Sequence, residues 1–167
     1  TNNGTVSGDP QVSNGAFVFD GTGDYISSTV TTTTGAGNWS HSFSFWMKAD
    51  TDASTSAHFV ALGTEGDSTS AIRFYGADAF IWYFWGNDII FNAPNTRGRW
   101  VHIVGTYDGG NEAGYAIGGV GVSRKIFINT VETTISSVSG TIGSLNLSTT
   151  STPFRIGSQL DNTDTFK

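Results

Sequence analysis

Short runs of alternating apolar and polar residues recur along this sequence, separated by clusters of glycine, asparagine, aspartate, serine and threonine. No stretch sustains apolar residues at the three- and four-residue spacing of an amphipathic helix. Alternation with a period of two is typical of half-buried β-strands, and frequent turn residues connect such strands into sandwiches. The pattern therefore predicts an all-β sandwich.

The alternation is clearest in the segment 42–48. Its inward face would carry Phe43, Phe45 and Met47, and its opposite face would carry Trp46. The clearest predicted strands are 16–20, 24–28, 42–48, 59–62, 71–75, 80–85, 89–91, 100–107, 125–128 and 154–156. The glycine-rich segment 111–123 is predicted to be a long loop.

The composition fits one β-rich domain covering residues 1–167. The chain contains 12 Phe and 5 Trp, and aromatic residues make up 13% of it. Aromatic side chains suit the pleated, half-buried surface of a sheet. A chain of 167 residues is long enough for one sizeable core and short for two.

The charge balance argues against nucleic acid as a partner. The formal net charge is −6 and no stretch concentrates lysine and arginine, so the attraction to phosphate that dominates nucleic-acid affinity is missing. No window approaches the roughly 18 consecutive apolar residues of a membrane-spanning helix, so we expect no membrane insertion.

Four blocks of sequence carry a family resemblance. They are AFVFDGTGDYI at 16–26, FSFWMK at 43–48, RWVHIVGTYDG at 99–109 and FRIGS at 154–158. In this order and spacing, the chain resembles the laminin G-like, pentraxin-type branch of the concanavalin A-like lectin/glucanase superfamily. The resemblance implies a two-sheet antiparallel jelly-roll sandwich.

The resemblance also implies one further strand. Members of the family usually continue beyond the position of Phe166 with a glycine and a final strand, and this sequence stops short of that strand. We expect either that the chain is a fragment or that another chain supplies the strand, since a missing strand exposes unpaired backbone.

Catalysis finds little support in the residues. Glycoside hydrolysis requires two carboxylates across a sugar ring, and the glutamates, which are Glu65, Glu112 and Glu132, fall in predicted loops or turns. We therefore expect no enzymatic activity, with a glycoside hydrolase kept as an alternative because the superfamily includes glucanases.

The segment 80–85 predicts a ligand site, because alternation makes both of its faces apolar. One face would meet the core, and the other would meet covering loops, a subunit or the C–H face of a sugar. The candidate ligand-binding residues are Trp82, Tyr83, Trp85, Asn87 and Asp88.

A structural Ca²⁺ is the one cofactor that the sequence suggests. The resemblance implies a calcium at one rim of the sandwich, and it points to Asp20 and Asp24, which flank a Gly-Thr-Gly turn. Carboxylates are ligands that calcium prefers. The alternative is an ordinary β-turn in which both side chains bond to local backbone amides.

Fold and composition together suggest two functions. The first is a non-catalytic carbohydrate- or surface-binding module of a larger extracellular or virion surface protein, with a glycan or surface polysaccharide as its partner. The second is a structural protein, such as a virion decoration, knob or fibre component, that acts through contacts with other virion or surface-protein subunits. A shared fold does not separate these functions.

Overall fold

The computed structural model describes residues 3–30, 39–64, 68–84, 86–110, 123–140, 152–158 and 165–167. This part of the chain forms β-strands and contains no helix. The strands are β1 (Thr5–Ser7), β2 (Gln11–Ser13), β3 (Ala16–Val18), β4 (Tyr25–Val30), β5 (His41–Met47), β6 (His58–Thr64), β7 (Ser68–Phe74), β8 (Ala79–Tyr83), β9 (Asn87–Asn92), β10 (Val101–Tyr107), β11 (Arg124–Ile128), β12 (Val131–Glu132), β13 (Ile135–Gly140) and β14 (Thr152–Ile156).

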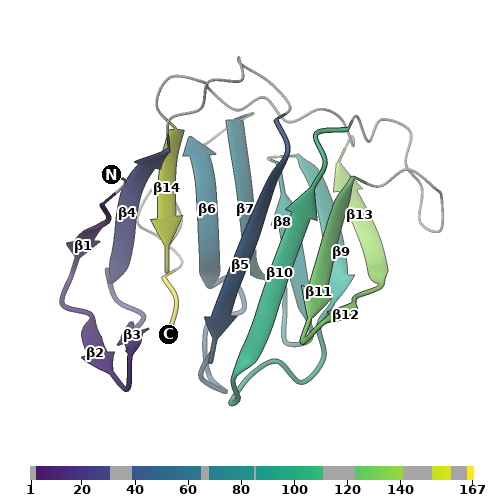
Figure 1. The fold of residues 1–167 in the computed structure, drawn as a ribbon. Helices are drawn as coiled ribbons and strands as arrows, with labels where there is room; N and C mark the ends of the chain where they lie inside the picture. Colours follow the sequence, from purple (N-terminus) through teal and green to yellow (C-terminus); the bar gives the residue numbers. More distant parts are fainter. Residues whose placement is uncertain are drawn as a thin grey trace.

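Two sheets form the layers of a sandwich. The larger sheet has the strand order β1-β4-β14-β6-β7-β8-β9-β13, and the smaller sheet has the order β12-β11-β10-β5. Figure 1 shows the smaller sheet in front of the larger one, with the short β2–β3 hairpin beside them. The named strands pair antiparallel, so the structure has the predicted all-β architecture.

Alternation along the strands builds the core between the sheets. In β10, every second residue from Val101 to Tyr107 is buried, and the three residues between them, His102, Val104 and Thr106, are half-buried. From the larger sheet, Phe80 and Trp82 of β8 belong to the same buried cluster. Each sheet therefore contributes every second side chain to one interior.

The ten predicted strands all correspond to observed strands, with boundaries shifted by a few residues. Four short or polar strands were not predicted, namely β1, β2, β12 and β13. Most of the predicted loop 111–123 lies outside the described residues. Within the part of the chain that the structure describes, no helix is long and apolar enough to cross a membrane.

Candidate functional site

Aromatic side chains stand exposed at one edge of the smaller sheet. Alternation in β5 turns Phe43 and Met47 into the core and turns Trp46 outward, as the sequence predicts. Trp46 is 64% exposed, and Trp100, directly before β10, is 51% exposed. Large apolar side chains with such exposure are available to a ligand.

The ring of Trp46 is held in place by the neighbouring strand. His102 of β10 lies opposite Trp46 in the antiparallel register. Their rings are stacked, with centroids 5.1 Å apart and an interplanar angle of 24°. A hydrogen bond of 3.1 Å joins Nε2 of His102 to Oγ of Ser44. The stack fixes one face of the indole and leaves the rest of the ring accessible.

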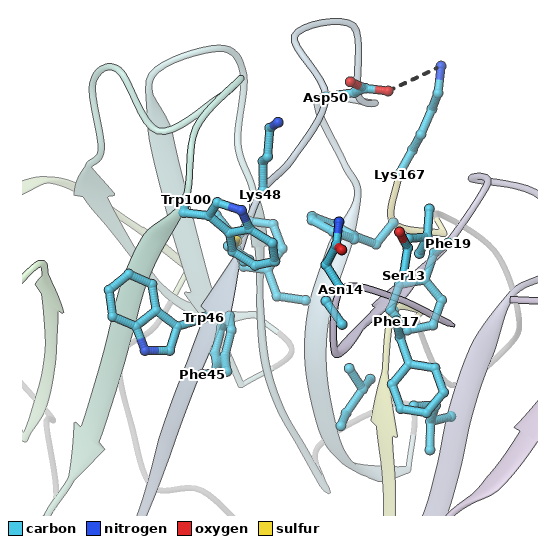
Figure 2. Close-up of a pocket in the computed structure, with 18 of the residues that line it drawn as sticks. Ser13, Asn14, Phe17, Phe19, Phe45, Trp46, Lys48, Asp50, Trp100 and Lys167 are labelled. Carbon is cyan, nitrogen blue, oxygen red and sulfur yellow. Dashed lines mark ion pairs between the residues drawn. The ribbon is translucent and has the colours of Figure 1, made fainter. Parts of the chain in front are cut away.

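A groove of about 960 Å³ runs beside these residues. Trp46, Trp100 and Phe45 line one side of it, and Phe17 and Phe19 of the hairpin region line the other (Figure 2). Polar groups at the rim include Ser13, Asn14, Lys48 and Asp50. The groove therefore combines apolar surfaces with a few hydrogen-bonding groups, as ligand sites commonly do.

The structure corrects the prediction that Trp82 faces a ligand. Its side chain is 0% exposed, and Nε1 donates a hydrogen bond of 2.9 Å to Oγ of Ser70. A Cβ added at Gly105 of the facing strand would lie 3.1 Å from the indole, so the ring packs directly against that backbone. Trp82 contacts the opposite sheet and presents no face to a sugar.

Tyr83 lies on the second face of this strand, which is also apolar, as expected. Tyr83 is buried in a small cluster with Ile81 and Ile90, and its hydroxyl lies 2.8 Å from Nε2 of His58. Burial withdraws Tyr83 from a ligand, contrary to the prediction. Trp85 lies outside the described residues.

Asn87 and Asp88 are the first two residues of β9. Asn87 is buried, and its carbonyl accepts a hydrogen bond of 2.8 Å from Nη1 of Arg124. Asp88 is half-buried, and burial raises the pKa of its carboxyl group, opposed by the backbone N–H of Asn87 and the charge of Arg124. These contacts hold the end of the strand in place. Asn87 is therefore not accessible to a ligand, contrary to the prediction.

The two predicted metal ligands meet a third carboxylate. Asp9, Asp20 and Asp24 each offer an oxygen, and these atoms lie within 4.8 Å of one another. The carboxylate of Asp24 is buried and accepts the backbone N–H groups of Asp9 at 2.9 Å and Asp20 at 3.1 Å. Asp20 accepts the N–H of Thr22. The side chains thus make the local bonds of a turn and retain oxygen lone pairs that suit a hard cation.

The fold agrees with a family match. The Laminin_G_3 model, described as the concanavalin A-like lectin/glucanases superfamily, matches residues 20–167. The chain belongs to this family. No curated protein gives a significant match to the chain.

Within this laminin G-like domain, sequence reasoning missed Trp46, Trp100 and Asp9 as site residues. Trp46 could have been found, because the alternation in 42–48 already placed it on the outer face. Trp100 lies at the edge of a predicted strand, where alternation does not fix its exposure. Asp9 lies 15 positions before Asp24 in the sequence, and its backbone N–H donates to the Asp24 carboxylate. No local sequence pattern predicts such a contact.

Proposed function

We propose that this laminin G-like domain is a non-catalytic module that binds a glycan or surface polysaccharide through Trp46 and Trp100. The observation that carries the proposal is the exposure of two tryptophans beside a groove. Trp46 lies on β5 and Trp100 directly before β10, and these two strands are paired in one sheet. The C–H groups of a pyranose ring pack well on the electron-rich face of an indole.

Polar groups near the tryptophans support the same ligand class. Ser44 and His102 lie on the exposed face beside Trp46, and Ser13 and Asn14 line the groove opposite it. Hydroxyl, imidazole and amide groups can both donate and accept hydrogen bonds, as sugar hydroxyls require. Such a site would bind its ligand by ring stacking and hydrogen bonds, and this binding needs no group that reacts with the ligand.

The proposal is tested by glycan-array binding of the wild-type protein and of Trp46→Ala and Trp100→Ala. We expect affinity for the bound glycan to fall roughly tenfold or more in each variant, as when an aromatic anchor is removed. Tyr75→Ala is the matched control, because Tyr75 is 48% exposed and does not line the groove. It should bind as the wild type does.

Three results would contradict this proposal. Silence across a broad array, with the protein folded, argues against a glycan ligand. In that case a stable oligomer in light scattering would favour the structural alternative, a subunit acting through assembly contacts. Equal losses in all three variants would indicate a general effect on the fold. Release of sugar products would instead favour the glycoside hydrolase alternative.

We also propose an extracellular or virion-surface location for the module. Charged residues make up only 13% of the chain, which contains 22 glycines and is rich in serine, threonine and asparagine. Such composition suits a surface-exposed binding or structural protein, with a glycan or neighbouring surface subunits as partners. Labelling of intact cells or virions with an antibody against the domain tests this location.

We further propose that Asp9, Asp20 and Asp24 hold one structural Ca²⁺. Three carboxylates within 4.8 Å of one another provide part of the six to eight oxygens that calcium takes. Bound calcium would tie the segment before β2 to the turn before β4. A ligand that binds only the folded state raises its stability.

Thermal unfolding in calcium and in EDTA tests this proposal. We expect a higher unfolding midpoint in millimolar Ca²⁺, and loss of that difference in Asp20→Asn, because Asp20 is an exposed member of the group. Asp108→Asn is the control, since Asp108 lies outside the group and its carboxylate accepts the N–H of Gly110. An identical midpoint in calcium and EDTA would refute the metal site.

A further inference from the structure

The β2–β3 hairpin stands apart from the two sheets of the sandwich. Its strands make three residue pairs with each other and none with any other described strand. Figure 1 shows the hairpin at the lower left of the molecule, beside the sheets. The side chains of Val12, Phe17 and Val18 are exposed. A two-stranded hairpin with so little buried apolar surface is marginally stable, so it should open locally more readily than the sheets do.

One buried carboxylate fastens the base of the hairpin. Oδ1 of Asp24 accepts the backbone N–H of Asp9, which lies two residues before β2, at 2.9 Å. Oδ2 of the same side chain accepts the N–H of Asp20, which lies two residues after β3, at 3.1 Å. Both ends of the hairpin are therefore held next to β4. A change at the tip would loosen the hairpin and leave its base, and the sandwich behind it, in place.

Asn14 and Gly15 form the two-residue tip of the hairpin, between the paired residues Ser13 and Ala16. Both tip residues are exposed, and both have positive φ, as a two-residue hairpin turn requires. A Cβ added at Gly15 would meet nothing within 4 Å. Among the residues that the structure describes, none forms a hydrogen bond with the side-chain amide of Asn14. The amide is therefore open to water, and the next backbone nitrogen is not shielded by a side chain.

We propose that Asn14 is a preferred deamidation site and that its isoaspartyl product undoes the pairing of β2 with β3. The backbone nitrogen of Gly15 attacks Cγ of the Asn14 side chain, so that a C–N bond forms and closes a succinimide ring. The bond from Cγ to the amide nitrogen breaks, and that nitrogen leaves as ammonia with the proton lost by Gly15. Water then opens the ring at either carbonyl and yields aspartate or isoaspartate. Water is the only co-reactant, and nothing is oxidised or reduced.

The isoaspartyl product changes the backbone itself. The chain then runs through the former side chain, which adds a methylene to a turn whose two residues fit the spacing of the strands. Because turn type and loop length fix the register of a hairpin, the longer turn displaces the pairing of Ser13 with Ala16. The aspartyl product keeps the turn, since aspartate also tolerates positive φ. It adds only a negative charge at the rim of the groove, which Asn14 lines.

A second Asn-Gly dipeptide, Asn3-Gly4, provides a comparison within the same chain. A Cβ added at Gly4 would lie 2.7 Å from Cγ2 of Ile26, so the backbone of Gly4 packs directly against β4. Ring closure at Asn3 must first break this contact. We expect Asn14 to react roughly tenfold faster or more in the folded protein, because opening packed backbone costs free energy. Unfolding in urea removes the contact and should make the two rates similar.

Ageing of the folded protein at mildly alkaline pH tests the proposal. Peptide mapping by mass spectrometry measures conversion of amide to acid at Asn14 and Asn3, and labelling by an isoaspartyl methyltransferase identifies the isoaspartyl product. In its NMR spectrum, the cross-strand contact between Val12 and Phe17 should be lost, while the signals of β4 stay unchanged. Asn14→Gly is the matched control, because glycine accepts positive φ and carries no amide. After the same ageing, it should keep the contact.

Three results would overturn the proposal. Equal rates at Asn14 and Asn3 in the folded protein would show that the exposed hairpin does not favour the reaction. A Val12–Phe17 contact that persists in the isoaspartyl form would show that the turn does not hold the register. Loss of that contact in freshly prepared Asn14→Asp would assign the effect to the new charge rather than to the longer backbone. None of these measurements involves a glycan, so their outcome is independent of the array experiment.

Discussion

A half-buried histidine links three strands at the level of single residues. Nδ1 of His41 donates to the carbonyl of Trp39 at 3.1 Å, so Nε2 accepts from the hydroxyl of Ser70 at 2.9 Å in the neutral ring. The same hydroxyl oxygen accepts the indole N–H of Trp82. Rings of Phe43 and Tyr107 pack on the imidazole, and burial lowers the pKa of His41 to about 4.

His41 should therefore make the fold less stable in acid. In the unfolded chain histidine titrates near its ordinary pKa of about 6.5, so the folded state binds fewer protons between that value and about 4. Stability is full above the higher value and falls as pH decreases through this interval, by at most about 3 kcal/mol. Urea unfolding of the wild type and of His41→Gln, at several pH values from neutral to four, measures the difference. A glutamine variant with the same acid slope would show that His41 is not responsible.

Packing contacts of single residues also explain why the ligand prediction failed at Trp82 and Tyr83. Alternation correctly made both faces of the strand apolar, but exposure depends on what packs over each face. Gly105, which lets the opposite sheet approach Trp82, lies 23 positions further along the sequence. Local sequence does not report such a contact.

At the level of strands and turns, the sequence prediction overlooked one clear hairpin. β2 and β3 join through Asn14 and Gly15, both with positive φ, at 51° and 78°. Asn-Gly between short strands is a strong hairpin signal, so this hairpin was predictable.

The hairpin between β11 and β12 was not predictable from its turn. It uses Asn129 and Thr130, with φ of 49° and 73°. A β-branched residue rarely adopts positive φ, so tertiary contacts must override its preference. One such contact is the backbone N–H of His102, which donates to the side chain of Asn129 at 2.9 Å.

Close packing between β8 and β10 gives a prediction at the scale of elements. Gly105→Val should destabilise the fold by about 1–3 kcal/mol, because a branched side chain would press on Ile72 and Trp82. Both neighbours are fully buried between the sheets. Chemical denaturation measures the change. Val104→Ile, on the outward-facing position next to it, is the control and should stay within about 0.5 kcal/mol of the wild type. Comparable losses in both variants would argue against a special contact at Gly105.

Across the whole molecule, sequence predicted the sandwich class and the inward faces of the central strands, because these follow from local alternation. Local alternation does not predict which strands pair when they are distant in the chain. β4 lies between β1 and β14, although more than 100 residues separate β4 from β14. The groove depends on such pairings, since residues from both ends of the chain line it, among them Phe17 and Phe166. The acidic group instead joins three residues within the first 24 positions.

A buried arginine fastens the two sheets together. Arg124 of β11 in the smaller sheet is 0% exposed, and its Nη1 donates to the carbonyl of Trp82 at 2.7 Å and that of Asn87 at 2.8 Å in the larger sheet. Its guanidinium carbon lies 3.9 Å from the ring centroid of Phe84. Hydrogen bonds from a charged donor are stronger than neutral ones, so this contact stabilises the stacking of the two layers.

Arg124→Met should therefore lower the free energy of unfolding by about 2–4 kcal/mol, since two carbonyls lose a charged donor while apolar contact is kept. Lys125→Met makes a similar change at the next residue, whose ammonium pairs with Glu132 at 3.4 Å on the surface. That control should cost less than about 1 kcal/mol, because exposed ion pairs contribute little. Urea unfolding of both variants measures the stability that each one loses. If they lose the same stability, the sandwich is held by its apolar interior alone, and the arginine only fills space between the sheets.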